Sequence, residues 1–296
     1  MALESIIVCP VCKANHFNPY TQCIDYTTTN ETFTIIQCTT CQLLITSPRP
    51  DANSIGSYYE SDSYISHTNN SKNLSDNAYR IIRTFTLRWK LKIIRNQKPT
   101  GKILDYGCGT GEFLNQCKQS NWECYGVEPA EPARRKATQL TTLDISDSLL
   151  KLNNKKFDVI TLWHVLEHVH NLNEKLSELK SHLAKDGILF IAVPNHECLD
   201  AKIYKTHWAA YDVPRHLWHF SQHNMKMLLA LHGLNIIDTI PMKQDSFYVS
   251  VLSEKYKNPT ANFLTNIVRA LIIGLRSNFA ARKTNNYSSL VFIAKP

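Results

Sequence analysis

Residues 103–111, with the sequence Ile-Leu-Asp-Tyr-Gly-Cys-Gly-Thr-Gly, constrain the fold of this 296-residue chain more than any other stretch. The short apolar run at residues 102–104 predicts a buried strand, Asp105 stands at its end, and a helical pattern opens at Glu112. Between them glycine occupies every second position, namely Gly107, Gly109 and Gly111. Because glycine lacks a Cβ atom, such a turn lets a ligand approach the main chain, and the N–H groups of the following helix face that ligand. The third glycine comes one residue earlier than in the G-x-G-x-x-G of dinucleotide enzymes, which favours a nucleoside-bearing ligand without a pyrophosphate.

Strand and helix patterns alternate between residues 102 and 195. The strand-like runs lie at residues 102–104, 123–127, 157–163 and 187–193. This alternation is typical of an α/β fold with a doubly wound parallel sheet, in which ligands bind at the carboxyl ends of the strands. Glu128 ends the second run, seventeen residues after Gly111, where an acidic side chain can accept hydrogen bonds from both hydroxyls of a ribose. A solvated strand end is the alternative role for this glutamate.

The segment from Asp105 to Gly111 resembles motif I of class I S-adenosylmethionine (SAM)-dependent methyltransferases. The resemblance implies a Rossmann-like, seven-stranded methyltransferase sheet and SAM as the cofactor. It also implies that Asp105 orients the loop or meets the methionine amino group, while Glu128 meets the ribose. The cofactor-binding residues expected on this basis are Asp105, Gly107, Cys108, Gly109, Gly111, Glu128 and His164.

Two Cys-x-x-Cys pairs stand near the N-terminus, separated by a 25-residue insert rich in threonine. The four cysteines are Cys9, Cys12, Cys38 and Cys41. Each pair can form a knuckle that aims two thiolates at one ion, and two knuckles complete a closed tetrahedral zinc site. We therefore predict a small N-terminal zinc ribbon with a structural Zn²⁺. A redox role for either pair is the alternative.

The sequence divides into three predicted parts. A zinc-ribbon-like module occupies residues 1–50, and a linker with a helical lid follows at residues 51–100. The methyltransferase domain is expected at residues 101–296, with a helical insertion at about 244–286. Packing of the linker aromatics against the catalytic part is the alternative to a lid that covers the cofactor.

The composition is ordinary for a soluble enzyme. Hydrophobic residues make up 43% of the chain, and no apolar run reaches the ~20 residues that span a bilayer. The N-terminus lacks the basic and apolar regions of a secretory signal, so a cytoplasmic location is expected. The nine cysteines are then expected as thiols or metal ligands rather than disulfides.

Three side chains after the run at 157–163 share one face of a helical turn: His164, Glu167 and His168. This segment resembles the Glu-x-x-Glu-His of quinone-biosynthesis O-methyltransferases, some of which use it to bind a divalent cation. Here His164 replaces the first glutamate. The three residues are therefore candidates for a metal site, for a hydrogen-bonded helix start, or, through His164 or His168, for a general base.

Aromatic, basic and imidazole side chains gather at residues 208–221, on the rim where substrate is expected to enter. The Asp-x-Pro-Arg-His-Leu within it resembles a subset of bacterial methyltransferases that also carry an N-terminal zinc ribbon. One interpretation is that Arg215, His216 and His219 recognise or deprotonate the methyl acceptor. The alternative is an ion pair between Arg215 and Asp212 that fixes the loop. The catalytic candidates are thus His164, His168, His216 and Arg215.

Three functions remain open from the sequence. The first is methyl transfer to a small molecule, with a hydroxyl of a metabolite, lipid precursor or sugar as the expected acceptor. The second is RNA methylation, which the net charge of +8 suggests, although the basic residues are scattered. The third is a non-catalytic binding protein, which the intact glycine loop argues against. Residues 261–276 could contact an anionic membrane peripherally, cap the substrate pocket or dimerise, with burial against the domain as the default.

Overall fold

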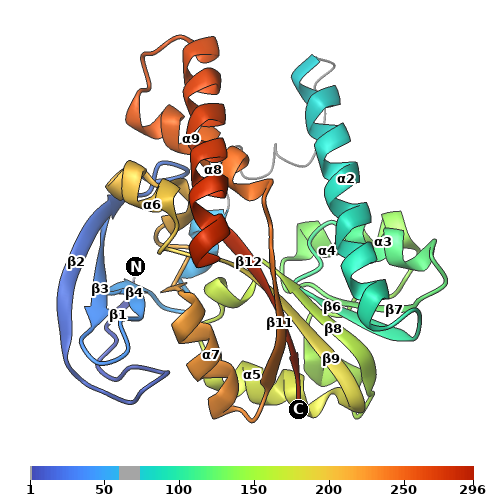
Figure 1. Ribbon diagram of the computed structural model, residues 1–296. Coiled ribbons are helices and arrows are strands. Elements are labelled where there is room, and N and C mark those ends of the chain that lie inside the picture. Colours follow the sequence, from blue (N-terminus) through green and yellow to red (C-terminus); the bar gives the residue numbers. More distant parts are fainter. Residues whose placement is uncertain (1, 60–73) are drawn as a thin grey trace.

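The computed structural model describes residues 2–59 and 74–296 and has a six-stranded central sheet (Figure 1). In spatial order the strands are β11 (Asn235–Pro241), β12 (Ser289–Lys295), β9 (Leu183–Pro194), β8 (Phe157–Trp163), β6 (Lys102–Tyr106) and β7 (Glu123–Val127). The last four are parallel to one another, and β12 runs antiparallel to its two neighbours, β9 and β11. At the β7 edge, a single parallel bridge between Val127 and Ser146 stands where a seventh strand would extend the sheet. The predicted α/β class with a mostly parallel sheet is confirmed.

Helices cover both faces of this sheet, and the strand residues alternate between the two faces. The helices are α2 (Leu74–Gln97), α3 (Glu112–Lys118), α4 (Glu131–Thr141), α5 (Leu172–Ser181) and α7 (Gln222–Leu231). Ile103 belongs to the core shared with α2 and α3, while its neighbour Leu104 belongs to the core shared with α5 and α7. Both side chains are completely buried. A strand buried on both faces reads as a continuous apolar run, which is why the central strands could be found in the sequence.

The N-terminal ribbon forms a second sheet, which lies beside the central sheet in Figure 1. Its strands, in spatial order, are β10 (Trp218–His219), β4 (Leu44–Thr46), β3 (Thr32–Cys38) and β2 (Phe17–Ile24). The first of them, β10, comes from the rim segment at 208–221, so the ribbon and the catalytic part share one sheet. A separate pair joins β1 (Leu3–Glu4) to β5 (Arg49–Pro50).

The remaining helices surround the upper part of the molecule. They are α6 (Leu199–Tyr204), α8 (Asp245–Lys257) and α9 (Phe263–Thr284). Short 3₁₀ turns complete the fold at η1 (Ile55–Tyr59), η2 (Leu149–Leu152), η3 (Leu166–His168), η4 (Lys205–His207) and η5 (Ala209–Tyr211). Helices α8 and α9 lie between β11 and β12 in the chain. Residues 60–73 of the predicted linker lie outside the described residues. Within the described part, no helix is long and apolar enough to cross a membrane.

Candidate active site

The glycine loop lies between the end of β6 and the start of α3, at the carboxyl edge of the parallel strands. Its three glycines have φ angles of +73°, +55° and +85°, a region that side-chain-bearing residues rarely adopt. The loop is anchored to β7, because the N–H groups of Gly107 and Cys108 donate to Val127 O at 2.8 and 3.1 Å. A Cβ atom on Gly107 would lie 2.6 Å from Val165, whereas a Cβ atom on Gly109 would meet nothing within 4 Å. Gly109 therefore faces open space where a ligand can approach the main chain.

Glu128 lies against this loop, as its position after β7 predicts. One carboxylate oxygen accepts the Gly109 N–H at 2.8 Å, and the other accepts the Ala130 N–H at 2.9 Å. The residue is only 9% exposed, so its carboxylate is fixed in place. Since each carboxylate oxygen has a second lone pair, hydroxyl groups of a ribose can still donate to it. The glycine loop and Glu128 together fit a nucleoside-bearing cofactor such as SAM.

Asp105 is buried at the end of β6, behind the loop. It accepts a hydrogen bond from Thr161 Oγ1 at 2.7 Å, and burial raises its pKa to about 7. The ammonium of Lys90 on α2 lies 4.4 Å from the centre of the Trp163 ring. Burial lowers the pKa of Lys90, and the nearby carboxylates of Asp105 and Asp245 oppose this. Lys90 was missed by sequence reasoning, because a lysine on a basic helix has no local signal that separates it from its neighbours.

His164 follows β8 with a φ angle of +57° and lies between two carboxylates. Its Nδ1 is 3.3 Å from Glu167 Oε1, and its Nε2 is 3.1 Å from Asp245 Oδ2. Although burial disfavours the charged ring, the hydrogen bonds to Asp245 and Glu167 raise the pKa of His164 to about 9. The ring is therefore positively charged at neutral pH, with both nitrogens engaged. Asp245, at the start of α8, is a second residue that the sequence did not reveal, since it lies 81 positions away.

A different trio gathers beside it: Glu167, His168 and His216 each have one donor atom within 4.8 Å of the others. Glu167 is completely buried, and its Oε2 has no hydrogen-bond partner in the described part of the protein. Two imidazoles and a carboxylate are a donor set that can hold a divalent cation or receive a proton. The converging trio therefore differs from the predicted one. His216 of the distant rim stands in the place that was predicted for His164.

Backbone contacts define the tautomers of both imidazoles. The Nδ1 of His216 lies 2.8 Å from Ala210 O, and that of His168 lies 3.0 Å from Arg215 O. Because a carbonyl oxygen only accepts, we assign the proton to each Nδ1, and Nε2 is then the basic nitrogen of each neutral ring. At His168 the Nδ1 also lies 3.0 Å from Tyr59 Oη, a hydroxyl oxygen that can accept from the same N–H group. Burial, and after it the neighbouring imidazole of His216, lower the pKa of His168 to about 4. His168 is therefore neutral at physiological pH.

Arg215 is buried, and each of its five N–H groups lies within hydrogen-bond distance of an acceptor. The acceptor residues are Asp212, Asp25, Thr28 and Tyr58. Two bonds go to the Asp212 carboxylate at 2.6 and 3.0 Å, so the ion pair considered as the alternative is present. Asp25 lies in the ribbon, at 3.1 Å from Arg215 Nη2. Arg215 thus joins the ribbon to the rim, and none of its N–H groups is left to bind a methyl-accepting substrate.

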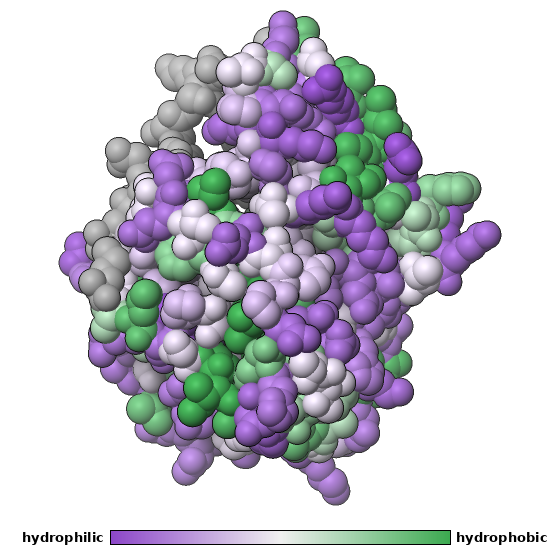
Figure 2. All heavy atoms as spheres, turned by 90° about the vertical axis from the view of Figure 1, so that its left-hand side faces the viewer, coloured by the Kyte–Doolittle hydropathy of each residue, from purple (hydrophilic) through white to green (hydrophobic). Residues whose placement is uncertain are grey.

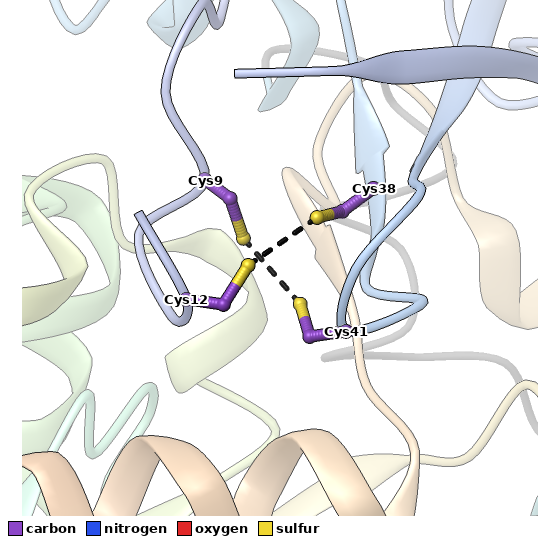
Figure 3. Close-up of side chains that lie close together, drawn as sticks. All are labelled: Cys9, Cys12, Cys38 and Cys41. Carbon is purple, nitrogen blue, oxygen red and sulfur yellow. Dashed lines mark hydrogen bonds between the residues drawn. The ribbon is translucent and has the colours of Figure 1, made fainter. Parts of the chain in front are cut away.

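The four N-terminal cysteines converge at one end of the ribbon (Figure 3). Their sulfur atoms lie 3.5 Å apart for Cys9 and Cys41 and 3.4 Å apart for Cys12 and Cys38, with all four within 4.8 Å. A tetrahedron with Zn–S bonds of ~2.3 Å has S–S edges of roughly 3.8 Å, so the cluster fits zinc. The two turns match, because the N–H groups of Lys13 and Gln42 donate at 3.0 Å to the first cysteine of each pair, with φ angles of +64° and +62°.

Comparison with known families matches residues 76–239 to the family described as "Methyltransferase domain". This span is more than half of the chain. The chain belongs to this methyltransferase family. With its sheet order, glycine loop and acidic residue after β7, it is a class I SAM-dependent methyltransferase, as the resemblance of motif I implies.

The methyltransferase is similar to curated relatives and to solved structures. It is 26% identical over 213 residues to a ubiquinone biosynthesis O-methyltransferase of Pelagibacter ubique, covering 64% of this chain and 82% of the relative. It is 32% identical over 107 residues to the protein of that name from Haemophilus ducreyi, but this covers 32% of the chain and 45% of the relative. The crystal structure of magnesium protoporphyrin IX methyltransferase from Synechocystis PCC 6803 with bound SAH aligns with a TM-score of 0.49 at 15% identity, over 77% of this chain and 90% of that one.

Proposed function

We propose that this methyltransferase moves a methyl group from SAM to a hydroxyl group of a small molecule. The names of the curated relatives, ubiquinone biosynthesis O-methyltransferases, support oxygen as the acceptor atom. On the cofactor side, Gly109 offers its main chain and Glu128 its carboxylate. Asp105 lies behind the loop, and its carboxylate would pair with the methionine ammonium of SAM. Lys90 lies beside the loop, and its ammonium would pair with the methionine carboxylate.

The observation that carries the proposal is the pair of imidazoles, His168 and His216, beside the buried Glu167, with His168 held neutral. We assign proton acceptance to Nε2 of His168 or His216, because an uncharged imidazole nitrogen can take a hydroxyl proton at neutral pH. The acceptor oxygen forms the new bond to the methyl carbon, the sulfur–carbon electron pair returns to sulfur, and the hydroxyl proton moves to the imidazole. His164 is charged between two carboxylates and holds Glu167 and Asp245 in place. Arg215 acts as a positioning residue.

The N-terminal cluster completes the proposal with a structural zinc ion bound by Cys9, Cys12, Cys38 and Cys41. Four sulfur ligands close the coordination sphere and leave no open position for chemistry. We keep the division into a ribbon at residues 1–50, a linker and lid at 51–100 and a methyltransferase domain at 101–296 as part of the proposal. A cytoplasmic location also remains a prediction. Neither RNA methylation nor a non-catalytic role is favoured over small-molecule transfer by any contact of the described residues.

The test is release of S-adenosylhomocysteine with a panel of phenols, catechols and sugars, beside amine and thiol analogues. We expect turnover with hydroxyl acceptors and little with the analogues. Replacing His168 or His216 by glutamine should lower turnover by about 100-fold, the usual effect of losing a general base, and should leave the SAM dissociation constant unchanged. The matched control is His223→Gln, at an exposed histidine on α7. Full turnover in both glutamine variants would remove the proposed role of the imidazole pair.

A further inference from the structure

Helix α9 packs on the protein through a face of small residues. The buried positions of this helix are Ala270, Gly274, Ser277 and Ala281. A Cβ atom on Gly274 would lie 2.6 Å from Phe247 of α8, so the two helices are in close contact at this point. Of the large apolar residues of α9, Ile273 packs against the buried core, whereas most of the others are exposed, contrary to the default expectation of burial.

Those large apolar residues form a stripe on the opposite face, which we call the α9 stripe. Its members and their exposed fractions are Leu264 70%, Val268 55%, Leu271 45%, Ile272 51%, Leu275 61% and Phe279 70%. Figure 2 shows hydrophobic residues gathered along the upper right of the molecule, at the level of α9. The spacing of three and four residues places them on one side of the helix. A contiguous exposed apolar surface of this kind marks an interaction site.

The charges beside the stripe have one sign. Four basic residues lie in the helix, namely Arg269, Arg276, Arg282 and Lys283, and no acidic residue occurs between Phe263 and Thr284. None of the four forms an ion pair with a described residue. A cavity of about 560 Å³ opens at the C-terminal end of the stripe. Its lining combines Leu275 and Phe279 with Lys243, Arg276 and Arg282.

We infer that α9 docks the methyltransferase on the surface of an anionic lipid bilayer. Apolar side chains flanked by lysine and arginine are the features of a helix that lies in the plane of a membrane interface. The stripe enters the acyl boundary, the basic residues meet lipid phosphates, and the cavity with Lys243, Arg276 and Arg282 accommodates a phosphate-bearing headgroup. A second copy of the chain fits less well, because a two-fold contact places the same surface on both partners and brings like charges together. This inference is independent of the acceptor that we propose.

The experiment is co-sedimentation of the full chain with vesicles. One set is pure phosphatidylcholine, and the other contains about 30% phosphatidylglycerol, an amount that gives a negative surface potential. We expect binding to the second set, weakened by salt. The double variant Leu271→Asp with Leu275→Asp should lose it, and Arg269→Glu with Arg276→Glu should weaken it by about tenfold or more, because each basic residue near the surface adds to the attraction. The control Leu150→Asp changes a 79% exposed leucine outside α9 and should bind as the wild type does.

SAM titration calorimetry of each variant verifies that the fold is intact, since the cofactor loop is not part of α9. Absence of binding to both vesicle sets would overturn the inference, as would undiminished binding of the Leu271/Leu275 variant. Concentration-dependent self-association of the wild type in sedimentation velocity, lost in that same variant, would also overturn it, because a second copy would then cover the stripe.

Discussion

In the site that we propose, the glycine loop is the cofactor side and the rim at residues 208–221 is the acceptor side. The two sides are supported by contacts of different sequence separation. The loop is closed by Glu128, which is 19 positions from Gly109. The rim is held by the ribbon, through Arg215 and Asp25 at a separation of 190 positions and through His219 and Thr46 at 173. The cofactor side is thus built from neighbouring segments of one βαβ unit, whereas the acceptor side requires a separate module to be folded and docked.

This difference predicts that substitutions in the ribbon lower the rate of methyl transfer without changing the affinity for SAM. Strand β10 of the rim pairs directly with β4 of the ribbon, and Asn224 at the start of α7 donates to Cys41 O at 2.7 Å. The Asn224 side chain therefore connects the cysteine cluster to the acceptor side, and main-chain pairing connects the ribbon sheet to it. We expect the two sides to respond separately to substitution.

The largest effect is expected from loss of the zinc ligands. Cys38→Ser should reduce bound zinc from about one equivalent to less than half, because structural zinc contributes on the order of 10 kcal/mol to the folding of such modules. Turnover should be lost, while the SAM dissociation constant measured by calorimetry should stay within about threefold, since no hydrogen bond among the described residues joins the glycine loop to the ribbon. Elemental analysis of purified protein gives the zinc content. Cys124→Ser, outside the cluster, serves as control, and a full zinc equivalent in Cys38→Ser would contradict the site.

Removal of the buried cation at the ribbon–rim junction should come next. Arg215→Met leaves Asp25 and Asp212 without their partner, and breaking a buried ion pair in this way costs about 3–5 kcal/mol. Urea unfolding measures this loss. Arg135→Met removes an exposed pair with Glu131 and should cost no more than about 0.5 kcal/mol. Equal stability of the two variants would show that Arg215 does not hold the junction.

On the cofactor side, a side chain at Gly109 should exclude SAM. Gly109→Arg fills the open space in front of the loop and forces an arginine into a φ angle of +55°, so we expect SAM binding to weaken by about 100-fold, roughly 3 kcal/mol. Gly56→Arg is the matched control, because Gly56 is exposed and also has nothing near its Cβ position. Calorimetric titration gives both dissociation constants. Wild-type affinity in Gly109→Arg would contradict the assignment of the loop as the SAM site.

The sequence predicted the cofactor side well for a physical reason. Strands buried on both faces read as unbroken apolar runs, and left-handed turns favour glycine, so β6, β8 and the loop each leave a local pattern. The helix expected at 261–276 runs on to Thr284, because neither glycine nor proline occurs between Arg276 and the left-handed Asn285.

The acceptor side could not be read in the same way. Strands β4 and β10 have three and two residues, too few for a periodic pattern. The ion pair between Arg215 and Asp212 was one of the alternatives predicted from the sequence. The second partner of Arg215, Asp25 of the ribbon, was not predicted, since no local pattern connects residues 190 positions apart. Lys90, beside the glycine loop, and Asp245, beside His164, were missed for the same reason: each is distant in the sequence from the residues that it approaches. Long-range packing, rather than sequence periodicity, selects these side chains.

The two sides should also differ in the sign of their pH dependence. On the acceptor side, the folded pKa of His168 is about 4, below the ordinary 6.5, so its contribution to stability is present above pH 6.5 and is lost as the pH falls toward 4. On the cofactor side, the folded pKa of Asp105 is about 7, above the ordinary 3.8, so its contribution is lost as the pH rises from 3.8 through 7. Each should amount to at most about 3–4 kcal/mol, since the shifts span about 2.5 and 3 pKa units and one unit corresponds to about 1.4 kcal/mol. Thermal unfolding between pH 4 and pH 8 measures both effects. His168→Gln should selectively remove the loss of stability at acid pH, and Asp105→Asn should selectively remove the loss of stability near neutral pH. Parallel pH profiles of the two variants would mean that the two sides do not titrate independently.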